Sequence, residues 1–374
     1  MTAPLTPIAA TLPASVPFVG PEEQERRRGR PFAARIGANE SVFGPSPAAV
    51  AAMQSAAAQA WKYADPTCEP LRQALAAHLD VDPGCVVIGE GIDGLLGLTV
   101  RLFAGPGDAV VTSAGAYPTF NYHVAGFGAR LVTVPYREDA EDPVALVAAA
   151  RADQARLVYV SNPDNPMGSV IRPERILALL DALPPGCLLC LDEAYGEFAE
   201  EGTLPAIAAA DPRVIRFRTF SKAYGLAGLR LGYAIAPPSV AGAFDRVRNH
   251  FGVNAMAQAA GVAALGDTAH LNRVVAATAA ARRRIAAIAE DCGLVALPSA
   301  THFVAVDCGG DGLLARRVMQ GLLDRDVFVR MPGVAPLDRC IRVGCGADAD
   351  LDHLAVALPA ALAEAHSALA PALS

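Results

Sequence analysis

Seven short apolar segments between residues 86 and 235 constrain the fold of this chain more than any other feature of its sequence. Most are continuous hydrophobic runs without polar alternation, which is typical of strands buried on both faces of a sheet. Helix-like segments separate them, and this alternation predicts an α/β fold with a mostly parallel central sheet covered by helices. The strands are expected at Val86–Ile88, Ala109–Thr112, Arg130–Val134, Leu157–Val160, Leu188–Leu191, Val214–Phe217 and Leu231–Ile235.

The sequence on either side of this region predicts two further parts. Residues before 36 are rich in proline and include a charged run from Glu22 to Arg30, which is typical of a solvated or subunit-crossing arm. After about Gly266, a long helix precedes short strands and helices, which indicates a smaller α+β domain. We therefore expect an arm over residues 1–35, a large domain over 36–265 and a small C-terminal domain over 266–374.

The overall composition excludes several classes of protein. Hydrophobic residues make up 53% of the chain and charged residues 18%, as in an ordinary soluble globular protein. The formal net charge of −7 argues against a nucleic-acid partner, which usually requires a basic face. No apolar run reaches the roughly 20 residues that span a bilayer, and the proline-rich start has no basic run. We therefore expect a cytoplasmic protein without a membrane segment or signal peptide.

The cysteines and histidines do not indicate a metal site. Eight cysteines are scattered along the chain, and the only close pair, Cys187 and Cys190, lies in a strand-like run. Residues three apart in a strand point to opposite faces, so we expect buried thiols and no metal ion. Isolated histidines such as His250 and His302 are expected to be structural rather than catalytic.

The segment GEGIDG, from Gly89 to Gly94, has the spacing of a dinucleotide-binding turn and lies between a predicted strand and a predicted helix. Such a turn needs an acidic residue at the carboxyl end of the next strand to bind the ribose hydroxyls. Asp108 precedes that strand, and no acid follows it, so we exclude a nicotinamide or flavin cofactor. Small residues still expose amides at a helix N-terminus, which favours a phosphate of another kind.

Polar residues follow several of the predicted strands at the point where each strand ends. Tyr117, Asn165, Asp192, Tyr195 and Lys222 all come within a few residues of such an end. In an open α/β sheet, ligands bind just outside the carboxyl ends of the strands. We therefore expect these side chains to converge at one edge of the sheet.

This set of side chains suits pyridoxal phosphate (PLP). The cofactor needs a lysine amine for a Schiff base and a carboxylate facing its pyridine nitrogen. An amide and a phenol can bond the ring hydroxyl, and an aromatic ring can pack over the pyridine face. Hydroxyls, an arginine and helix N-terminal amides suit its phosphate.

Three sequence blocks carry a resemblance to a known family. NPDNPMG at 162–168, DEAY at 192–195 and TFSKAYGLAGLRLGY at 219–233 resemble the signature blocks of class I/II aminotransferases, which are PLP enzymes of fold type I. The similarity is closest to the histidinol-phosphate aminotransferase branch, through GANESVFGPSP at 37–47 and IRVG at 341–344. The resemblance implies PLP as cofactor, an amino donor and a 2-oxo acid as substrates, and a homodimer.

The resemblance also implies the roles of the residues around the cofactor ring. Lys222 would form the Schiff base and act as the general base. Asp192 would pair with the pyridine nitrogen, and Asn165 and Tyr195 would bond the ring hydroxyl. Tyr117 would stack on the ring, a role for which Phe120 and Tyr122 are alternatives. The phosphate would be held by Thr219, Ser221, Arg230, the amides of Ile92 and Asp93, and Tyr63 of the neighbouring subunit.

The substrate is less constrained than the cofactor. Arg342 would bind the acidic group of the substrate, and Arg330 would join it if that group is a phosphate, since two guanidinium groups suit a dianion. Met167 and the segment 248–254 depart from the family pattern and suit an aromatic side chain equally well. Three enzymes remain open: a histidinol-phosphate:2-oxoglutarate aminotransferase, an aromatic or other amino-acid aminotransferase, and a PLP-dependent phospho-amino-acid decarboxylase. Lys222 and Asp192 argue against a PLP-binding regulatory module without turnover.

Overall fold

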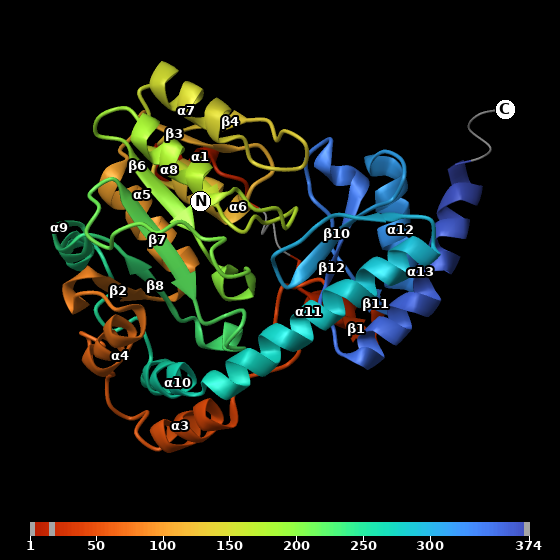
Figure 1. The fold of residues 1–374 in the computed structure, drawn as a ribbon, viewed down its shortest axis with the longest axis horizontal. Coiled ribbons are helices and arrows are strands. Elements are labelled where there is room, and N and C mark those ends of the chain that lie inside the picture. The colour runs from red at the N-terminus through yellow and green to blue at the C-terminus, as the bar shows by residue number, and fades with distance from the viewer. Residues whose placement is uncertain (1–3, 15–18, 370–374) are drawn as a thin grey trace.

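The computed structural model describes residues 4–14 and 19–369, and its centre is a seven-stranded sheet (Figure 1). The strand order is β2-β8-β7-β6-β5-β3-β4. β8 runs antiparallel to both of its neighbours, and the other pairs are parallel. The expected mostly parallel sheet is therefore confirmed. Its strands are β2 (Val86–Gly89), β3 (Ala109–Ser113), β4 (Arg130–Val134), β5 (Leu157–Ser161), β6 (Leu188–Asp192), β7 (Val214–Thr219) and β8 (Gly232–Ile235).

Helices cover both faces of this sheet because successive strand residues point to opposite sides. Val110 packs with the helices of one face, whereas its neighbour Val111 packs with those of the other. The first face carries α5 (Gly91–Phe103) and α6 (Pro118–Gly126). The second carries α4 (Glu69–Leu79), α7 (Pro143–Ala152), α8 (Pro173–Ala182) and α10 (Ala255–Gly266), with α3 (Pro47–Ala57) packed on α10.

A second, smaller body is built around the antiparallel sheet β12-β10-β9. Its hydrophobic core is separate from those of the large sheet. α11 (Thr268–Asp291) runs from the region of α10 to this small sheet, as Figure 1 shows. This body also contains β9 (Val295–Ala296), β10 (Phe303–Asp307), α12 (Gly312–Asp324), β12 (Cys340–Gly344) and α13 (Asp348–Leu369).

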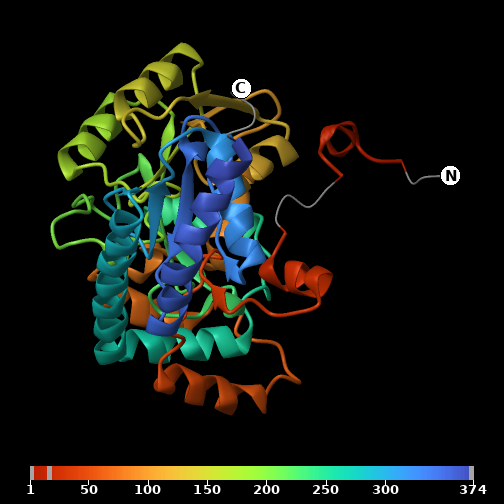
Figure 2. The same ribbon diagram turned by 90° about the vertical axis from the view of Figure 1, so that its right-hand side faces the viewer.

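The later part of the described N-terminal segment docks on the small body through α2 (Pro21–Arg28) and β1 (Ala34–Arg35), as Figure 2 shows. The earlier α1 (Pro7–Thr11) contacts α6 of the large body instead. β1 pairs in parallel with β11 (Val327–Phe328), and Arg28 forms an ion pair with Asp326. The expected domain boundaries after residues 35 and 265 stay predictions.

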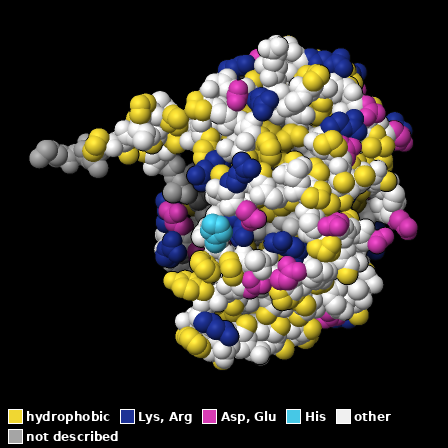
Figure 3. Space-filling view, turned by 90° about the vertical axis from the view of Figure 1, so that its left-hand side faces the viewer, with side chains coloured by type: hydrophobic (Ala, Val, Ile, Leu, Met, Phe, Trp, Pro, Cys, Tyr) yellow, Lys and Arg dark blue, Asp and Glu magenta, His cyan; other side chains and the backbone are white. Residues whose placement is uncertain are grey.

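The surface seen in Figure 3 intermingles basic, acidic and hydrophobic side chains. Over residues 4–14 and 19–369, no helix is long and apolar enough to cross a membrane.

Candidate active site

The carboxyl ends of three neighbouring strands bring the predicted site residues together. Asp192 is the last residue of β6, and it pairs in register with Ser161 of β5 and Phe217 of β7. Lys222 comes three residues after the end of β7, and Asn165 lies in the loop after β5. The sequence-predicted convergence therefore follows from the parallel pairing of these strands.

Lys222 has the environment of a reactive amine. Its side chain is half-buried, and its Nζ donates a hydrogen bond to the backbone carbonyl of Asn39 over 2.8 Å. Burial lowers the pKa of Lys222 to about 8, and the positive charges of Arg342 and Arg230 act in the same direction. About a tenth of the amine is therefore uncharged at pH 7, and this uncharged form is the one that a nucleophile or a general base requires.

Asp192 is buried and fixed by two hydrogen bonds. Its Oδ2 accepts from the Tyr159 hydroxyl over 2.7 Å, and its Oδ1 accepts from the Ala194 amide over 2.9 Å. Burial raises the pKa of Asp192 to about 6, although both hydrogen bonds favour the ionised form. Tyr159 was not among the predicted site residues, because a tyrosine in a buried strand resembles an ordinary core residue. The ring of Phe120 stacks on Tyr159 with a centroid distance of 4.5 Å, so Phe120 belongs to the core.

A hydrogen bond joins the large sheet to the small one inside the site. Arg342 of β12 donates from Nη1 to Oδ1 of Asn165 over 2.6 Å. The Arg342 guanidinium carbon also lies 5.1 Å from the ring centroid of Phe303. Burial lowers the pKa of Arg342 to about 10, which leaves it charged at neutral pH. Arg342 and Asn165, predicted separately, therefore face each other.

Asn39 contacts two of the predicted site residues and was not among them. Its side-chain amide donates to the Tyr195 hydroxyl over 3.3 Å, and its carbonyl accepts from Lys222. Tyr195 is buried, and this burial raises the pKa of its hydroxyl. Asn39 lies within the GANESVF segment, and the sequence alone did not indicate which residue of that segment would face the site.

The start of α5 forms a cradle with Arg230. Gly91 has φ +76°, and a Cβ at this position would lie 2.6 Å from Nη2 of Arg230. A Cβ on Gly232 would lie 2.8 Å from the Ile92 nitrogen, so the backbone is closely packed there. Nearby, Thr219 Oγ1 accepts from the Ser221 amide over 3.0 Å. A helix N-terminus beside a guanidinium is suited to an anion.

Two further predicted residues lie beside this cradle. The Asp93 carboxylate is 3.0 Å from Nε2 of His123, so its side chain is already paired while its amide stays at the helix N-terminus. Tyr117 is half-buried immediately before α6, and Asp93, Asp192 and Arg230 are close enough to influence the pKa of its hydroxyl. Burial is the main cause that raises this pKa. Tyr122, an alternative to Tyr117, is 39% exposed.

Tyr63 and Arg330 occupy different surroundings. Tyr63 is 82% exposed, and its ring packs on Phe251 with a centroid distance of 4.7 Å. The backbone of Arg330 pairs with that of Arg342, but its Nη2 donates to the carbonyl of Val19 over 2.7 Å. The arginines are thus neighbours, and the Arg330 side chain also binds the N-terminal segment.

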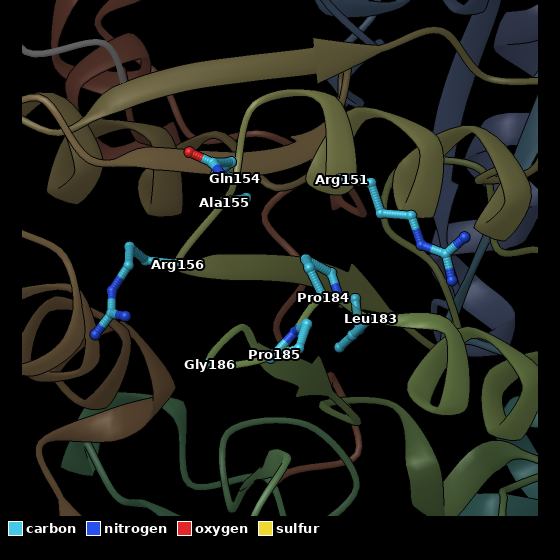
Figure 4. A pocket seen from close by; sticks show the side chains of 8 residues that line it. All are labelled: Arg151, Gln154, Ala155, Arg156, Leu183, Pro184, Pro185 and Gly186. Carbon is cyan, nitrogen blue, oxygen red and sulfur yellow. The ribbon is translucent and has the colours of Figure 1, made fainter.

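A surface pocket of about 380 Å³ lies away from these residues, at the opposite end of β5 and β6 (Figure 4). Its two arginines, Arg151 and Arg156, point away from each other in Figure 4. Each is engaged with a backbone carbonyl, of Ala182 and Phe103 respectively. The two guanidinium groups therefore do not form a joint binding site for an anion.

Comparison with known proteins identifies aminotransferases as relatives of this chain. The family model described as aminotransferase class I and II matches residues 34–358. A histidinol-phosphate aminotransferase of Moorella thermoacetica is 36% identical over 329 residues, which is 87% of this chain and 84% of that protein. An aromatic amino acid aminotransferase of Mycolicibacterium paratuberculosis is 35% identical, over 92% of this chain and 98% of that protein.

One solved structure is similar over nearly the whole chain. The histidinol-phosphate aminotransferase of Sinorhizobium meliloti, crystallised in complex with pyridoxal-5'-phosphate, is 54% identical. The match has a TM-score of 0.94 and covers 97% of this chain and 99% of that one. The expected fold class is therefore confirmed.

Proposed function

Because the chain belongs to the class I and II aminotransferase family, we propose that it transfers an amino group from histidinol phosphate to a 2-oxo acid with pyridoxal 5'-phosphate as cofactor. The observation that carries this proposal is the 54% identity to the histidinol-phosphate aminotransferase of Sinorhizobium meliloti, whose structure contains the cofactor. The backbones of Arg330 and Arg342 pair, and the charge of Arg330 acts on the Arg342 guanidinium. This supports a substrate with a phosphate, because two neighbouring guanidinium groups can share a dianion.

The residues present fit the cofactor. The close approach of Gly91 to Arg230 provides a cradle that a side chain would fill, beside the amides of Ile92 and Asp93. Thr219 and Ser221 add hydroxyls near this cradle, so we assign these residues to the phosphate. Asp192, at the end of the neighbouring strand β6, provides the buried carboxylate that the pyridine nitrogen needs. When bound, the cofactor supplies a ring that accepts electrons from the substrate Cα.

Lys222 would bind the cofactor covalently and would then remove the proton from the substrate Cα. Its lowered pKa makes the uncharged amine available for both tasks. Asp192 would keep the pyridine nitrogen protonated, and Tyr159 and Ala194 orient its two oxygens for this purpose. Asn165 and Tyr195 would bond the ring hydroxyl, and Tyr117 would pack on the ring face.

Arg342 would hold the acidic group of the substrate at the small-sheet side of the site. Its hydrogen bond to Asn165 fixes the guanidinium next to a residue that we assign to the cofactor ring. A bidentate contact of this kind is worth roughly 1.5–3 kcal/mol. Arg330 would add a second contact for a phosphate. It could do so whether its side chain keeps or releases the hydrogen bond to the Val19 carbonyl.

We further propose a homodimer in which Tyr63 reaches the phosphate of the neighbouring subunit's cofactor. Tyr63 and Trp61 are each 82% exposed, and the ring of Tyr63 packs on the half-exposed Phe251. Clustered exposed aromatic side chains are typical of a protein–protein contact.

An aromatic amino-acid donor is the second candidate, because a relative with that printed activity is 35% identical. Met167, which the sequence offered as a lining for an aromatic pocket, is 1% exposed and packs with Ala305, Leu337 and Cys340. It therefore belongs to the core and does not favour this candidate. The deciding experiment compares kcat/KM for histidinol phosphate and phenylalanine with 2-oxoglutarate as acceptor. A preference for phenylalanine, or turnover that does not need the acceptor, contradicts the proposal.

A further inference from the structure

His123 of α6 has no role in the proposed function, although its side chain reaches the helix turn that we assign to the cofactor phosphate. Its Nε2 lies 3.0 Å from Oδ1 of Asp93, the third residue of α5. A carboxylate accepts hydrogen bonds and does not donate them, so this ring nitrogen carries the proton. Tyr117 directly precedes α6, so the contact joins the helix that follows the proposed stacking residue to the helix that begins the phosphate cradle.

The imidazole of His123 rests on α5 at a position that has no side chain. A Cβ on Gly97 would lie 2.7 Å from Cε1 of His123 and 2.8 Å from its Nδ1, so a larger residue there would displace the ring. Gly97 is buried in the interior of the helix, where glycine is less favourable than alanine. The chain therefore has a glycine where the ring needs space, one helical turn after Asp93.

Two acidic side chains stand at the start of α5, and both are bound away from it. Glu90 is the N-cap residue, and its Oε1 accepts from Nδ2 of Asn249 over 3.4 Å instead of capping the helix. Asp93, in the first turn, is held by His123. Acidic side chains at such positions are attracted to the free amides of the first turn. Because these two carboxylates are held elsewhere, neither of them occupies the amides of the cradle.

We propose that His123 is a positioning residue for the cofactor phosphate, which holds the Asp93 carboxylate away from the first turn of α5. This inference rests on the proposed function, which assigns the amides of Ile92 and Asp93 to that phosphate. Without the imidazole, the carboxylate can turn toward these amides, where it competes with the phosphate for the same donors and repels its negative charge. The side chains of His123 and Asp93 are 28% and 38% exposed, so we expect the pair to add little to stability itself.

The test measures the Kd of two ligands for the cofactor-free protein by absorbance titration. The ligands are pyridoxal phosphate and pyridoxal, which lacks the phosphate. His123→Phe keeps a ring over Gly97 and removes the hydrogen bond, whereas His123→Gln restores a donor. A double variant combines His123→Phe with Asp93→Ala and so also removes the competing carboxylate. His353→Phe, at an exposed position of α13, is the matched control.

We expect His123→Phe to weaken the binding of pyridoxal phosphate by about tenfold and that of pyridoxal by less than about twofold, because only the phosphate competes with the carboxylate. The double variant should recover most of the lost affinity, His123→Gln should recover part of it, and His353→Phe should bind both ligands normally. Equal losses for the two ligands, or no recovery in the double variant, would show that His123 only packs between the helices, and the inference would be wrong.

Gly97→Ala provides a second measurement if His123→Phe does not fold. Alanine favours the helix, but its Cβ displaces the ring of His123, so the Kd of pyridoxal phosphate should rise relative to that of pyridoxal. An unchanged ratio of the two Kd values overturns the inference. Binding is measured without substrate. A wild type that binds pyridoxal phosphate but does not use histidinol phosphate therefore contradicts the proposed function alone, whereas equal losses for the two ligands contradict this inference alone.

Discussion

Asn165 and Arg342, 177 positions apart in the sequence, meet at 2.6 Å between an amide oxygen and a guanidinium nitrogen. One residue follows a strand of the large sheet, and the other lies within a strand of the small sheet. The predicted ligand of the cofactor ring thus touches the predicted ligand of the substrate. A change at either residue is therefore expected to affect both cofactor and substrate binding.

Lys222 is expected to be the residue that attaches the cofactor. Its lowered pKa and its position after β7 make it the most reactive amine of the predicted site. Borohydride reduction of the loaded protein should fix the cofactor on the peptide that contains Lys222, as detected by mass spectrometry. Lys62, which is exposed and is the one other lysine in the sequence, is the control lysine. A label on any other lysine contradicts the assignment.

The rate at which cofactor-free protein captures PLP is expected to depend on pH with a midpoint near 8, the value to which burial lowers the pKa of Lys222. Below this value, the uncharged fraction falls about tenfold for each pH unit, so capture slows as the pH decreases. Arg342→Met removes a positive charge that disfavours the ammonium form, so the midpoint should move upward. A midpoint that stays in place in Arg342→Met argues against this electrostatic account.

Loss of the Asp192 carboxylate is expected to weaken cofactor binding and to slow turnover by several orders of magnitude, because the ring nitrogen loses its partner. Tyr159→Phe removes one hydrogen bond that favours the ionised carboxylate and should raise the pKa of Asp192 further. We expect about a tenfold weaker Kd for the cofactor at neutral pH in this variant, measured by absorbance titration. Tyr122→Phe, which removes the hydroxyl of a partly exposed tyrosine, is the control and should bind normally.

Tyr63 tests whether the site is shared between subunits. Each of the variants Tyr63→Ala and Lys222→Ala is expected to have little activity alone, because one lacks a contact to the neighbouring cofactor and the other lacks the amine. Mixed subunits should regain activity, since a hybrid dimer contains one complete site. If native mass spectrometry shows hybrid dimers without any recovery, Tyr63 does not act across the interface.

Arg330 tests whether the substrate carries a phosphate. Arg330→Ala is expected to lower kcat/KM for histidinol phosphate by about tenfold or more, and for phenylalanine by much less, because a charge-assisted contact is lost only with the phosphate. Arg317→Ala, on the exposed side of α12, is the control and should change neither value. Equal losses with both donors would favour a broader amino-acid aminotransferase.

The sequence was sufficient to predict those site residues that lie at or directly after the ends of buried strands. Asp192 and Lys222 could be predicted because parallel strands align their carboxyl ends, which requires no knowledge of side-chain packing. Asn39 and Tyr159 could not, since one lies in an irregular segment and the other has a strand position typical of core residues. The hydrogen bond from Arg330 to the Val19 carbonyl was also not predictable. The two residues are 311 positions apart, and no sequence pattern indicates that they meet.

The contact between Lys222 and the carbonyl of Asn39 spans 183 positions, and that between Asn165 and Arg342 spans another 177. A ribosome must therefore release residue 222 before the first contact can close and residue 342 before the second. Contacts between residues so distant in sequence form slowly, because the entropy of closing long loops is lost before the contacts stabilise the chain. The central sheet, whose last strand ends at Ile235, can thus form on the ribosome before Arg342 is available to complete the ligand site.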